Sequence, residues 1–567
     1  MKKNVLALSI AAMIGGFAGA ASAQNVEQGT GPLTIKNDVT SKMDKSTATQ
    51  FAISEGGSGH VLLVPYFTSQ DKNMSVIHVV NTDSKNGKAL KVRFRGAANS
   101  DDLLDFTVFL SPGDVWTGAV QANDKGSYFR TDDGSCTIPD IRKTDVQFGK
   151  SRLNKSWDAD KLTNNTKEGY VEIFNAADIP SDKIYGKDGD AQSALYTAIK
   201  HVNGVAPCTS SVLDTTLNYG GELDTEAKKA NFGFNTPTGQ LTGDWYILNV
   251  DQTTTFSGAA TALKALDAAG VSGRGNYVLF PQQGESVAAD QYTADPLLIT
   301  KPVNKDGKVL KGPLVQPNNA DLPDLSTPYF VGGADAAGVN AAKQAFELTA
   351  SLAKGAVSNQ YATDSILKAK TDWVFSMPTR RYSVAANYNA LVSSADYAVF
   401  NLGVNTAGKL AGAAQSAAAV ASTPAQAATE LVYFNTSNVS IDATTGNLCV
   451  NSSATKFYDR EETAKTGGSF VSPVESQTLR FCGETSVLSF SNDKSVLGAS
   501  IARSVTTEAY VNGWANVSLA KANSANANVI GGLPMVGASF IKLTNSGGLA
   551  NNFSGTYGIT WPHRYGN

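Results

Sequence analysis

Apolar and polar residues alternate in short runs along much of the chain. The clearest run covers residues 88–95, where three apolar residues, at 90, 92 and 94, alternate with Lys91, Arg93 and Arg95. Successive side chains of a strand point to opposite faces of a sheet, so this run predicts a strand with one apolar and one charged face. Similar runs predict further strands at 60–67, 75–81, 105–110, 115–117, 169–175, 245–250, 276–280, 373–376, 397–401, 431–435, 486–490, 514–519 and 537–543.

Turn-forming dipeptides separate the first of these runs. Asn86-Gly87 precedes one run, and Pro112-Gly113 lies between two others. Short alternating runs that are split by such turns are typical of antiparallel sheets folded into sandwiches. The pattern therefore predicts a mainly β protein with antiparallel β-sandwich domains of immunoglobulin or jelly-roll type.

Three Ala-rich segments interrupt the strand pattern, at 258–269, 334–354 and 410–430. In the second of them Val339, Phe346 and several alanines fall on one face of a helix. We expect a few helical insertions here, which would cap or bridge the sandwiches or line a cleft.

Residues 1–23 have the features of a secretory signal peptide. Lys2 and Lys3 give a positive start, a short apolar run follows, and 21–23 form an Ala-x-Ala cleavage site. The run is too short for a membrane-spanning helix, and no later stretch approaches the roughly 18 apolar residues that one needs. We therefore expect an exported chain that begins near Gln24 and has no transmembrane segment in its mature form.

The rest of the chain is too long for a single hydrophobic core. Its composition and its prolines predict four parts: a polar extended arm at 24–59, an N-terminal β-sandwich region at 60–300, a linker at 301–328, and a C-terminal β-rich region with helical insertions at 329–567.

The mature chain holds four cysteines: Cys136, Cys208, Cys449 and Cys482. An even number in an exported protein indicates disulfides, with three possible connectivities. Pairing neighbours, Cys136 with Cys208 and Cys449 with Cys482, closes the shortest loops and is the pairing we favour. The spacings match no zinc motif.

The charge of the chain excludes some partners. The full chain has a formal net charge of −3, only 17% of its residues are charged, and no basic patch suits nucleic acid. This composition favours an extracellular β-rich protein over a cytosolic enzyme.

Candidate catalytic residues are few. Ser351 begins an S-x-x-K motif and residues 465–467 read K-T-G, but no S-D-N element connects them. A glycosidase pair of carboxylates would leave no mark in a linear sequence, so a hydrolase remains an alternative. The four histidines show no metal-ligand spacing and are His60, His78, His201 and His563. We assign no catalytic residue and expect a protein that is not an enzyme.

Calcium is the cofactor that the turns would suit. Asp132 and Asp133 precede a glycine, and Asp188 and Asp190 flank another. Carboxylates in such turns supply the hard oxygen ligands that Ca²⁺ prefers. Ordinary solvated turns have the same residues, so both interpretations stay open.

Several segments resemble a family of exported proteobacterial cell-surface proteins that includes the surface-layer and nanopod-type proteins of betaproteobacteria. The segments are GHVLLVPYFTSQ with VVNTD, KALKVRFRGAANSDDLLDFTVFLSPGDVWT at 88–117, DWVFSMPTRRY at 372–382, GLPMVGASFIKLTN at 532–545 and the closing TYGITWPHRYGN. The resemblance implies a structural protein at the outer surface of the cell. The sequence shows neither a sorting motif with a hydrophobic tail nor a lipobox, so we expect non-covalent anchoring, with lipopolysaccharide as the hypothetical partner.

We therefore expect a cell-surface protein that self-assembles into a surface layer on the outer membrane. Interfaces between identical copies that do not close on themselves give open arrays. The alternative is a periplasmic or secreted protein that binds a carbohydrate or another small ligand. Trp116, Trp245 and Trp373 would then be stacking platforms, and this alternative requires that they line an open cleft.

Overall fold

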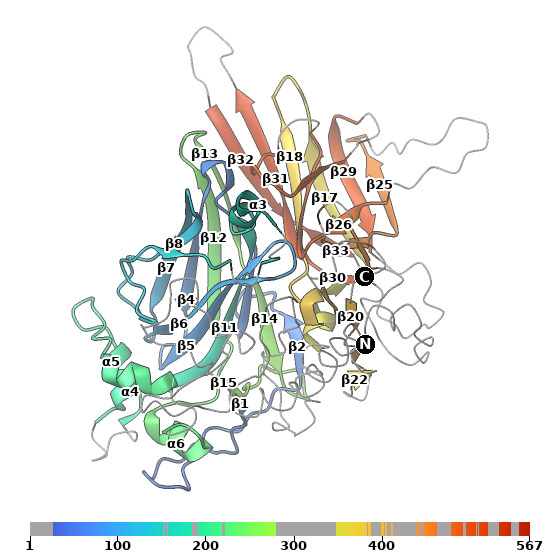
Figure 1. The fold of residues 1–567 in the computed structure, drawn as a ribbon. Helices are drawn as coiled ribbons and strands as arrows, with labels where there is room; N and C mark the ends of the chain where they lie inside the picture. The colour runs from blue at the N-terminus through green and yellow to red at the C-terminus, as the bar shows by residue number, and fades with distance from the viewer. Residues whose placement is uncertain are drawn as a thin grey trace, which may run out of the picture.

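The described part of the chain is mainly β, as predicted. The computed structural model describes residues 26–150, 153–154, 157–183, 191–217, 222–278, 347–382, 384–386, 399–401, 403–404, 410–411, 439–442, 445, 447–461, 478–491, 495–505, 507, 510–519, 532–545 and 555–566. Figure 1 shows N-terminal sheets beside C-terminal sheets, with short helices at the lower edge.

Two antiparallel sheets form the N-terminal sandwich. The first has seven strands, in the order β2 (Gln50–Ile53), β14 (Thr261–Leu266), β3 (Val61–Thr68), β11 (Glu168–Pro180), β5 (Asn86–Gly96), β6 (Asp102–Leu110) and β9 (Cys136–Ile138). The second has six, in the order β10 (Val146–Gln147), β8 (Gly126–Arg130), β7 (Val115–Asn123), β4 (Met74–Asn81), β12 (Leu241–Asn249) and β13 (Thr254–Ala259).

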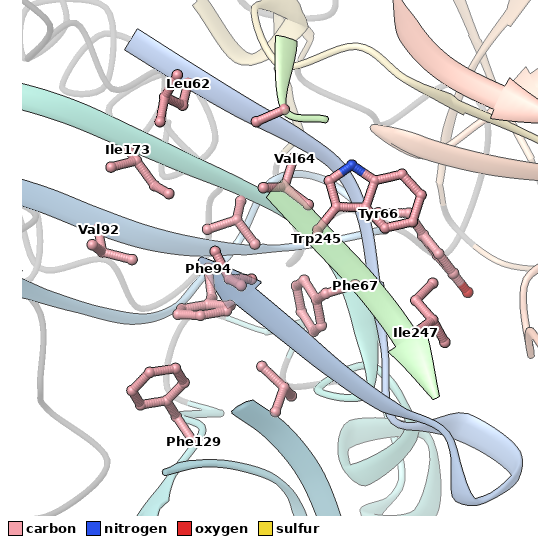
Figure 2. Packing of buried hydrophobic residues seen from close by; sticks show 14 of the residues in the cluster. Leu62, Val64, Tyr66, Phe67, Val92, Phe94, Phe129, Ile173, Trp245 and Ile247 are labelled. Atoms are coloured by element: carbon pink, nitrogen blue, oxygen red, sulfur yellow. The ribbon is translucent and has the colours of Figure 1, made fainter. Parts of the chain in front are cut away.

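The core of this sandwich lies between the two sheets. Leu62, Val64 and Phe94 come from the seven-stranded sheet and pack in one cluster with Phe129 and Trp245 of the six-stranded sheet (Figure 2). These apolar side chains stand at alternate positions of their strands, which is the pattern that the sequence predicts.

A second pair of sheets forms the C-terminal part. One has the order β28 (Ala502–Ser504), β27 (Thr485–Ser489), β18 (Lys370–Ser376), β31 (Val536–Asn545) and β32 (Gly555–Pro562). The other has the order β25 (Ala454–Tyr458), β29 (Asn512–Ser518), β17 (Ala356–Ala362) and β33 (Arg564–Gly566). Trp373, Phe375, Tyr361 and Val517 pack between them in a second buried cluster.

The remaining elements are short. The small sheets pair β1 (Val26–Glu27) with β15 (Tyr277–Val278), β16 (Ala353–Lys354) with β30 (Leu533–Pro534), β19 (Val384–Ala386) with β20 (Val399–Asn401), β21 (Gly403–Val404) with β22 (Leu410–Ala411), and β24 (Leu448–Asn451) with both β23 (Val439–Ile441) and β26 (Arg480–Cys482). The described helices are α3 (Ala159–Asn164), α4 (Ala194–Ile199), α5 (Ser210–Leu213), α6 (Glu226–Phe232), the helical residues 347–352 and the single turns η1 (Gln70–Lys72), η3 (Asp214–Leu217) and η5 (Arg380–Tyr382).

The two halves of the described chain share a core. Phe540 of β31 packs against Trp245 and Phe256 of the N-terminal sandwich, with ring centroids 5.8 and 5.4 Å apart. The Ser376 hydroxyl of β18 donates a hydrogen bond to the Pro65 carbonyl of β3. The halves are therefore packed together directly.

The prediction of a helix at 258–269 is wrong. These residues form the end of β13 and all of β14, and β14 pairs with β2 and β3. Ala262 and Ala265 are buried in the seven-stranded sheet. Alanine favours helices in isolation, but neighbouring strands override this weak preference where they offer hydrogen bonds and a small buried space.

The extended arm predicted at 24–59 is packed onto the N-terminal sandwich. Met43 is fully buried, and β2 belongs to the seven-stranded sheet. The Glu226 carboxylate of α6 accepts hydrogen bonds from the backbone N–H of Thr30 and of Met43, at 2.8 and 2.9 Å. A polar segment without apolar periodicity is thus held because side chains of the sandwich satisfy its backbone groups.

Some predictions fall wholly or partly outside the described residues. The signal peptide at 1–23, the linker at 301–328 and the strand at 431–435 lie outside them. Of the helix predicted at 334–354, residues 347–352 are described and helical, whereas 353–354 form β16. Of the helix predicted at 410–430, residues 410–411 are described, and they form β22.

Candidate functional site

The charged face of β5 is buried in the protein. Lys91, Arg93 and Arg95 of this face have almost no exposed surface, and neither has Lys88, which lies earlier on the same strand at a position of the other face. The Lys88 ammonium lies 2.7 Å from a carboxylate oxygen of Asp178 on the neighbouring strand β11. A row of charges that would be solvated on a free sheet is therefore held inside by paired charges, as burial requires.

Carboxylates on both neighbouring strands complete this row. Lys91 forms an ion pair with Asp105 of β6, and Arg95 Nε lies 3.4 Å from Glu172 of β11. The Arg93 guanidinium stands over the Phe174 ring at 5.8 Å. The pairs join residues that are adjacent in the sheet but 14 or 77 positions apart in the chain.

The buried charges continue into the C-terminal half through Arg381 of η5. Its guanidinium binds both carboxylate oxygens of Glu172 and donates a 2.7 Å hydrogen bond to the Tyr170 hydroxyl. The bond to the second Glu172 oxygen measures 2.9 Å. A planar guanidinium that binds a carboxylate at two points fixes orientation as well as distance. Arg381 thus joins the two halves; we call the Arg381–Glu172–Arg95 group the ionic clamp.

A parallel contact lies beside the ionic clamp. Arg380 Nε donates to Glu484 at 3.1 Å, and its Nη1 donates to the Leu448 carbonyl at 2.8 Å. Its Nη2 reaches the Ala98 carbonyl of the N-terminal half at 3.4 Å. Arg380 and Arg381, which are neighbours in the turn η5, therefore both contact the N-terminal half.

Burial shifts the pKa of several groups in this layer. Burial raises the pKa of Tyr170 well above its usual range and also raises the pKa of Glu484. Burial and the adjacent Asp105 raise the pKa of Asp102 to about 6, and burial lowers the pKa of Lys91 to about 8. Each shift arises first from desolvation, which occurs in buried ion-pair networks as well as in active sites. These groups have almost no surface that a substrate could reach, which suits internal support.

Two histidines are buried as neutral rings. His563 accepts a 2.8 Å hydrogen bond at Nδ1 from the Asn359 amide and donates a 2.9 Å bond from Nε2 to the Val374 carbonyl. His60 has the same arrangement, with the Ala265 N–H at Nδ1 and the Gly273 carbonyl at Nε2. These partners assign the tautomers. Burial lowers the pKa of His60 to about 4 and that of His563 to about 3.

Acidification from pH 6.5 to pH 4 is expected to destabilise the protein through these rings. Their folded pKa values lie below the ordinary value of 6.5, so the unfolded state binds more protons in this window and stability falls as the pH falls. For His563 the loss is on the order of 3 kcal/mol. The raised pKa of Asp102 acts in the opposite direction below about pH 6.

The comparison of wild type with His563→Gln isolates this effect. Glutamine keeps a donor and an acceptor but does not titrate. Urea unfolding at pH 7 and at pH 4.5 is expected to show a smaller loss of stability on acidification for the variant. The same loss in both proteins would contradict the assignment of a neutral, buried His563.

The tryptophans that the sequence offers as stacking platforms are core residues. Trp116 and Trp245 belong to the cluster of the N-terminal sandwich, and Trp373 belongs to the C-terminal cluster. Trp116 stacks on Phe129, and the Trp373 indole donates to the Gln360 carbonyl at 2.9 Å. The prediction of ligand stacking by these three residues is therefore wrong, because alternate aromatic positions in a strand look the same whether they face a core or a cleft.

The structure describes two of the four predicted calcium ligands, and these two have different partners. The Asp132 carboxylate pairs with Arg130, whereas Asp133 accepts hydrogen bonds from the Ser135 N–H and hydroxyl at 2.8 and 2.7 Å. These contacts are typical of an ordinary Asx turn. Asp188 and Asp190 lie outside the described residues. Calcium binding at these turns stays a prediction.

Both predicted disulfides are present. Cys136 of β9 is bonded to Cys208, and Cys449 of β24 is bonded to Cys482 of β26. Among the described residues, one set of acidic and sulfur side chains lies close enough to hold a metal ion, and it consists of Asp442 with the second cysteine pair. Because these cysteines are bonded to each other, they offer no thiolate to a metal.

The S-x-x-K motif has an ordinary structural environment. The Ser351 hydroxyl donates a 2.7 Å hydrogen bond to the Leu348 carbonyl, and the Lys354 ammonium stands 5.7 Å over the Tyr565 ring. The K-T-G residues at 465–467 lie outside the described residues.

Two groups of exposed apolar side chains were not predicted from the sequence. One is spread over the β17–β18 turn, the residue before β29 and the start of β32. It comprises Ile366, Leu367, Val511 and Tyr557, of which Ile366 is 88% and Tyr557 63% exposed. The Leu367 carbonyl accepts the Thr544 N–H, and Leu543 pairs with Tyr557, so these elements meet there. We call this the upper apolar group.

The other group lies in the turn between α4 and α5. Val202 and Val205 face solvent there, with Val205 62% exposed. We call this pair the lower apolar group. Figure 1 shows α4 and α5 at the lower left and the β17–β18 turn at the top, so the two groups stand at opposite ends of the molecule. Single valines and leucines in turns leave no signal in a sequence, because apolar residues occur on every protein surface.

Among the described residues, no helix is both long and apolar enough to cross a membrane. A search of protein-family models, of curated proteins and of solved structures found no match to this chain.

Proposed function

We propose that the protein is an exported structural protein of the cell surface that assembles with copies of itself. The observation that carries the proposal is the pair of exposed apolar groups at opposite ends of the described chain. Clustered apolar side chains in water mark surfaces that other molecules cover.

A second copy of the chain is the occupant that both groups suit. When the upper apolar group of one copy meets the lower apolar group of the next, each contact buries both. Such a head-to-tail contact leaves one free group at each end, and the placement of the groups at opposite ends of the molecule favours an open row over a closed ring. Rows of this kind are the elementary units of a layer.

The interior supports a mechanical role. The ionic clamp joins the halves, and two disulfides close loops of 72 and 33 residues. The histidines at 60 and 563 and the tryptophans at 116, 245 and 373 are engaged in internal packing. These five side chains are therefore engaged in holding the fold together.

Separate observations support the proposed location. The signal-peptide pattern at 1–23 and the two disulfides favour an oxidising compartment outside the cytoplasm. The resemblance to betaproteobacterial surface-layer proteins favours the outer surface, with lipopolysaccharide as the non-covalent partner.

Removal of either apolar group is expected to prevent self-association. Sedimentation velocity of the mature chain over a range of concentrations should show growing species for the wild type. The double variant Ile366→Ser with Leu367→Ser, and the double variant Val202→Ser with Val205→Ser, should both remain monomeric, because they remove the two sides of one contact.

A matched control replaces an exposed aromatic residue elsewhere. Trp514 of β29 is exposed but belongs to neither group, so Trp514→Ala should associate like the wild type. A wild type that stays monomeric, or double variants that associate unchanged, would contradict the proposal.

A further inference from the structure

The outer face of the sheet β25-β29-β17-β33 faces solvent, and its side chains form regular rows. Alternate residues of each strand point inward, and Val357, Tyr361 and Val517 are buried there. The outward residues form two rows across the sheet. One row is Tyr458, Trp514 and Gln360, and the other is Lys456, Asn516, Ser358 and Arg564.

The first row holds an aromatic pair of which Trp514 is exposed and Tyr458 half-buried. Tyr458 and Trp514 stand opposite each other on adjacent strands, with ring centroids 4.2 Å apart and planes 11° from parallel. Trp514 remains 37% exposed, in contrast to the buried Trp116, Trp245 and Trp373. The pair therefore presents apolar ring surface to solvent on the outer face of the sheet, where it adds nothing to the hydrophobic core.

The second row is polar and positively charged. Asn516 donates a 2.8 Å hydrogen bond to the Ser358 hydroxyl, which fixes the centre of the row. Lys456 and Arg564 lie at its two ends and are exposed. None of the outward positions of these four strands holds an aspartate or a glutamate, although the whole chain has a net charge of −3.

We propose that this face binds an anionic polysaccharide. A sugar ring has an apolar C–H face that can lie on aromatic ring surface, and its hydroxyls bond to amides and hydroxyls such as those of Gln360, Asn516 and Ser358. Carboxylate or phosphate groups along the polymer are complementary to Lys456 and Arg564. The face is an open sheet and not a cavity, so it suits an extended chain of sugars.

This inference places carbohydrate recognition on residues other than the buried tryptophans. It is independent of self-assembly, because the upper and lower apolar groups lie outside these two rows. A uronic-acid polymer and a phosphate-bearing lipopolysaccharide share the anionic sugar chemistry, and they are separate arms of the test.

Binding to alginate, to purified lipopolysaccharide and to neutral dextran tests the proposal on the mature chain. Affinity electrophoresis should show retardation by one or both of the anionic polymers and none by dextran. Trp514→Ala should weaken that binding at least tenfold, while Trp561→Ala, which removes an exposed aromatic residue of another sheet and of neither apolar group, should leave it unchanged. Alginate binding alone assigns a uronic-acid polymer, and lipopolysaccharide binding alone assigns the phosphate-bearing source.

Charge provides a second test that does not depend on how Trp514→Ala folds. Lys456→Gln changes one exposed side chain and should weaken binding and reduce its dependence on salt. Equal retardation by dextran, no binding to either anionic polymer, or unchanged binding in both variants would overturn the proposal. A Trp514→Ala variant that loses self-association but keeps polysaccharide binding would also overturn it, because the face would then be a contact between copies.

Discussion

Replacement of Arg381 by methionine is expected to lower the free energy of unfolding by about 3 to 5 kcal/mol. Arg381 binds both oxygens of Glu172 and also bonds to the Tyr170 hydroxyl and the Pro378 carbonyl. Glu172 is almost fully buried. In the variant its carboxylate keeps the longer contact to Arg95 but loses its bonds to the Arg381 guanidinium. The expected loss is therefore mainly the cost of an undercompensated buried charge.

A double-mutant cycle with Glu172→Gln separates the pair from its surroundings. Because Arg381→Met and Glu172→Gln remove the same interaction, their effects on urea unfolding should be far from additive. Arg130→Met is the matched control, since Arg130 forms exposed ion pairs with Asp132 and Asp145 and should matter little. A small loss for Arg381→Met, equal to that of the control, would show that the ionic clamp does not hold the halves together.

Removal of the first disulfide should have an effect of similar size. Cys136→Ser with Cys208→Ser opens a loop of 72 residues, and the chain-entropy relation gives a loss of about 4 kcal/mol. Cys136 is fully buried on β9, next to the Ala198 carbonyl of α4. The variant should therefore also loosen α4 and α5, which limited proteolysis of the folded protein would detect.

Reducing agent provides the control for this variant. It should destabilise the wild type and have a smaller effect on the double-serine variant, which has only the Cys449–Cys482 bridge to lose. Unchanged stability of the variant under oxidising conditions would contradict a structural role for the first bridge.

Strand positions were predictable because burial on one face leaves an alternating pattern. β5 shows this directly, since Leu90, Val92 and Phe94 lie in the core as their spacing predicts. The Ala-rich stretch at 258–269 was not predictable by the same means. Alanine is too small to show alternation clearly, and the pairing with β2 and β3 depends on residues far away in the chain.

The sequence did not reveal that the charged residues of β5 are buried. Lys91, Arg93 and Arg95 alternate with apolar residues in the same way on a solvated face and on a buried one. Their burial depends on partners such as Glu172 and Arg381, which the fold brings together from separate regions. The same limit applies to aromatic residues, because Trp373 in the core and Trp514 on the surface both stand in alternating strands.

Electron microscopy of negatively stained, purified mature protein tests the proposed self-assembly most directly. At high concentration and with calcium present, we expect rows of end-to-end contacts or periodic sheets, and we expect neither for the Ile366→Ser, Leu367→Ser double variant. A wild-type protein that remains a monodisperse monomer under these conditions would contradict self-assembly.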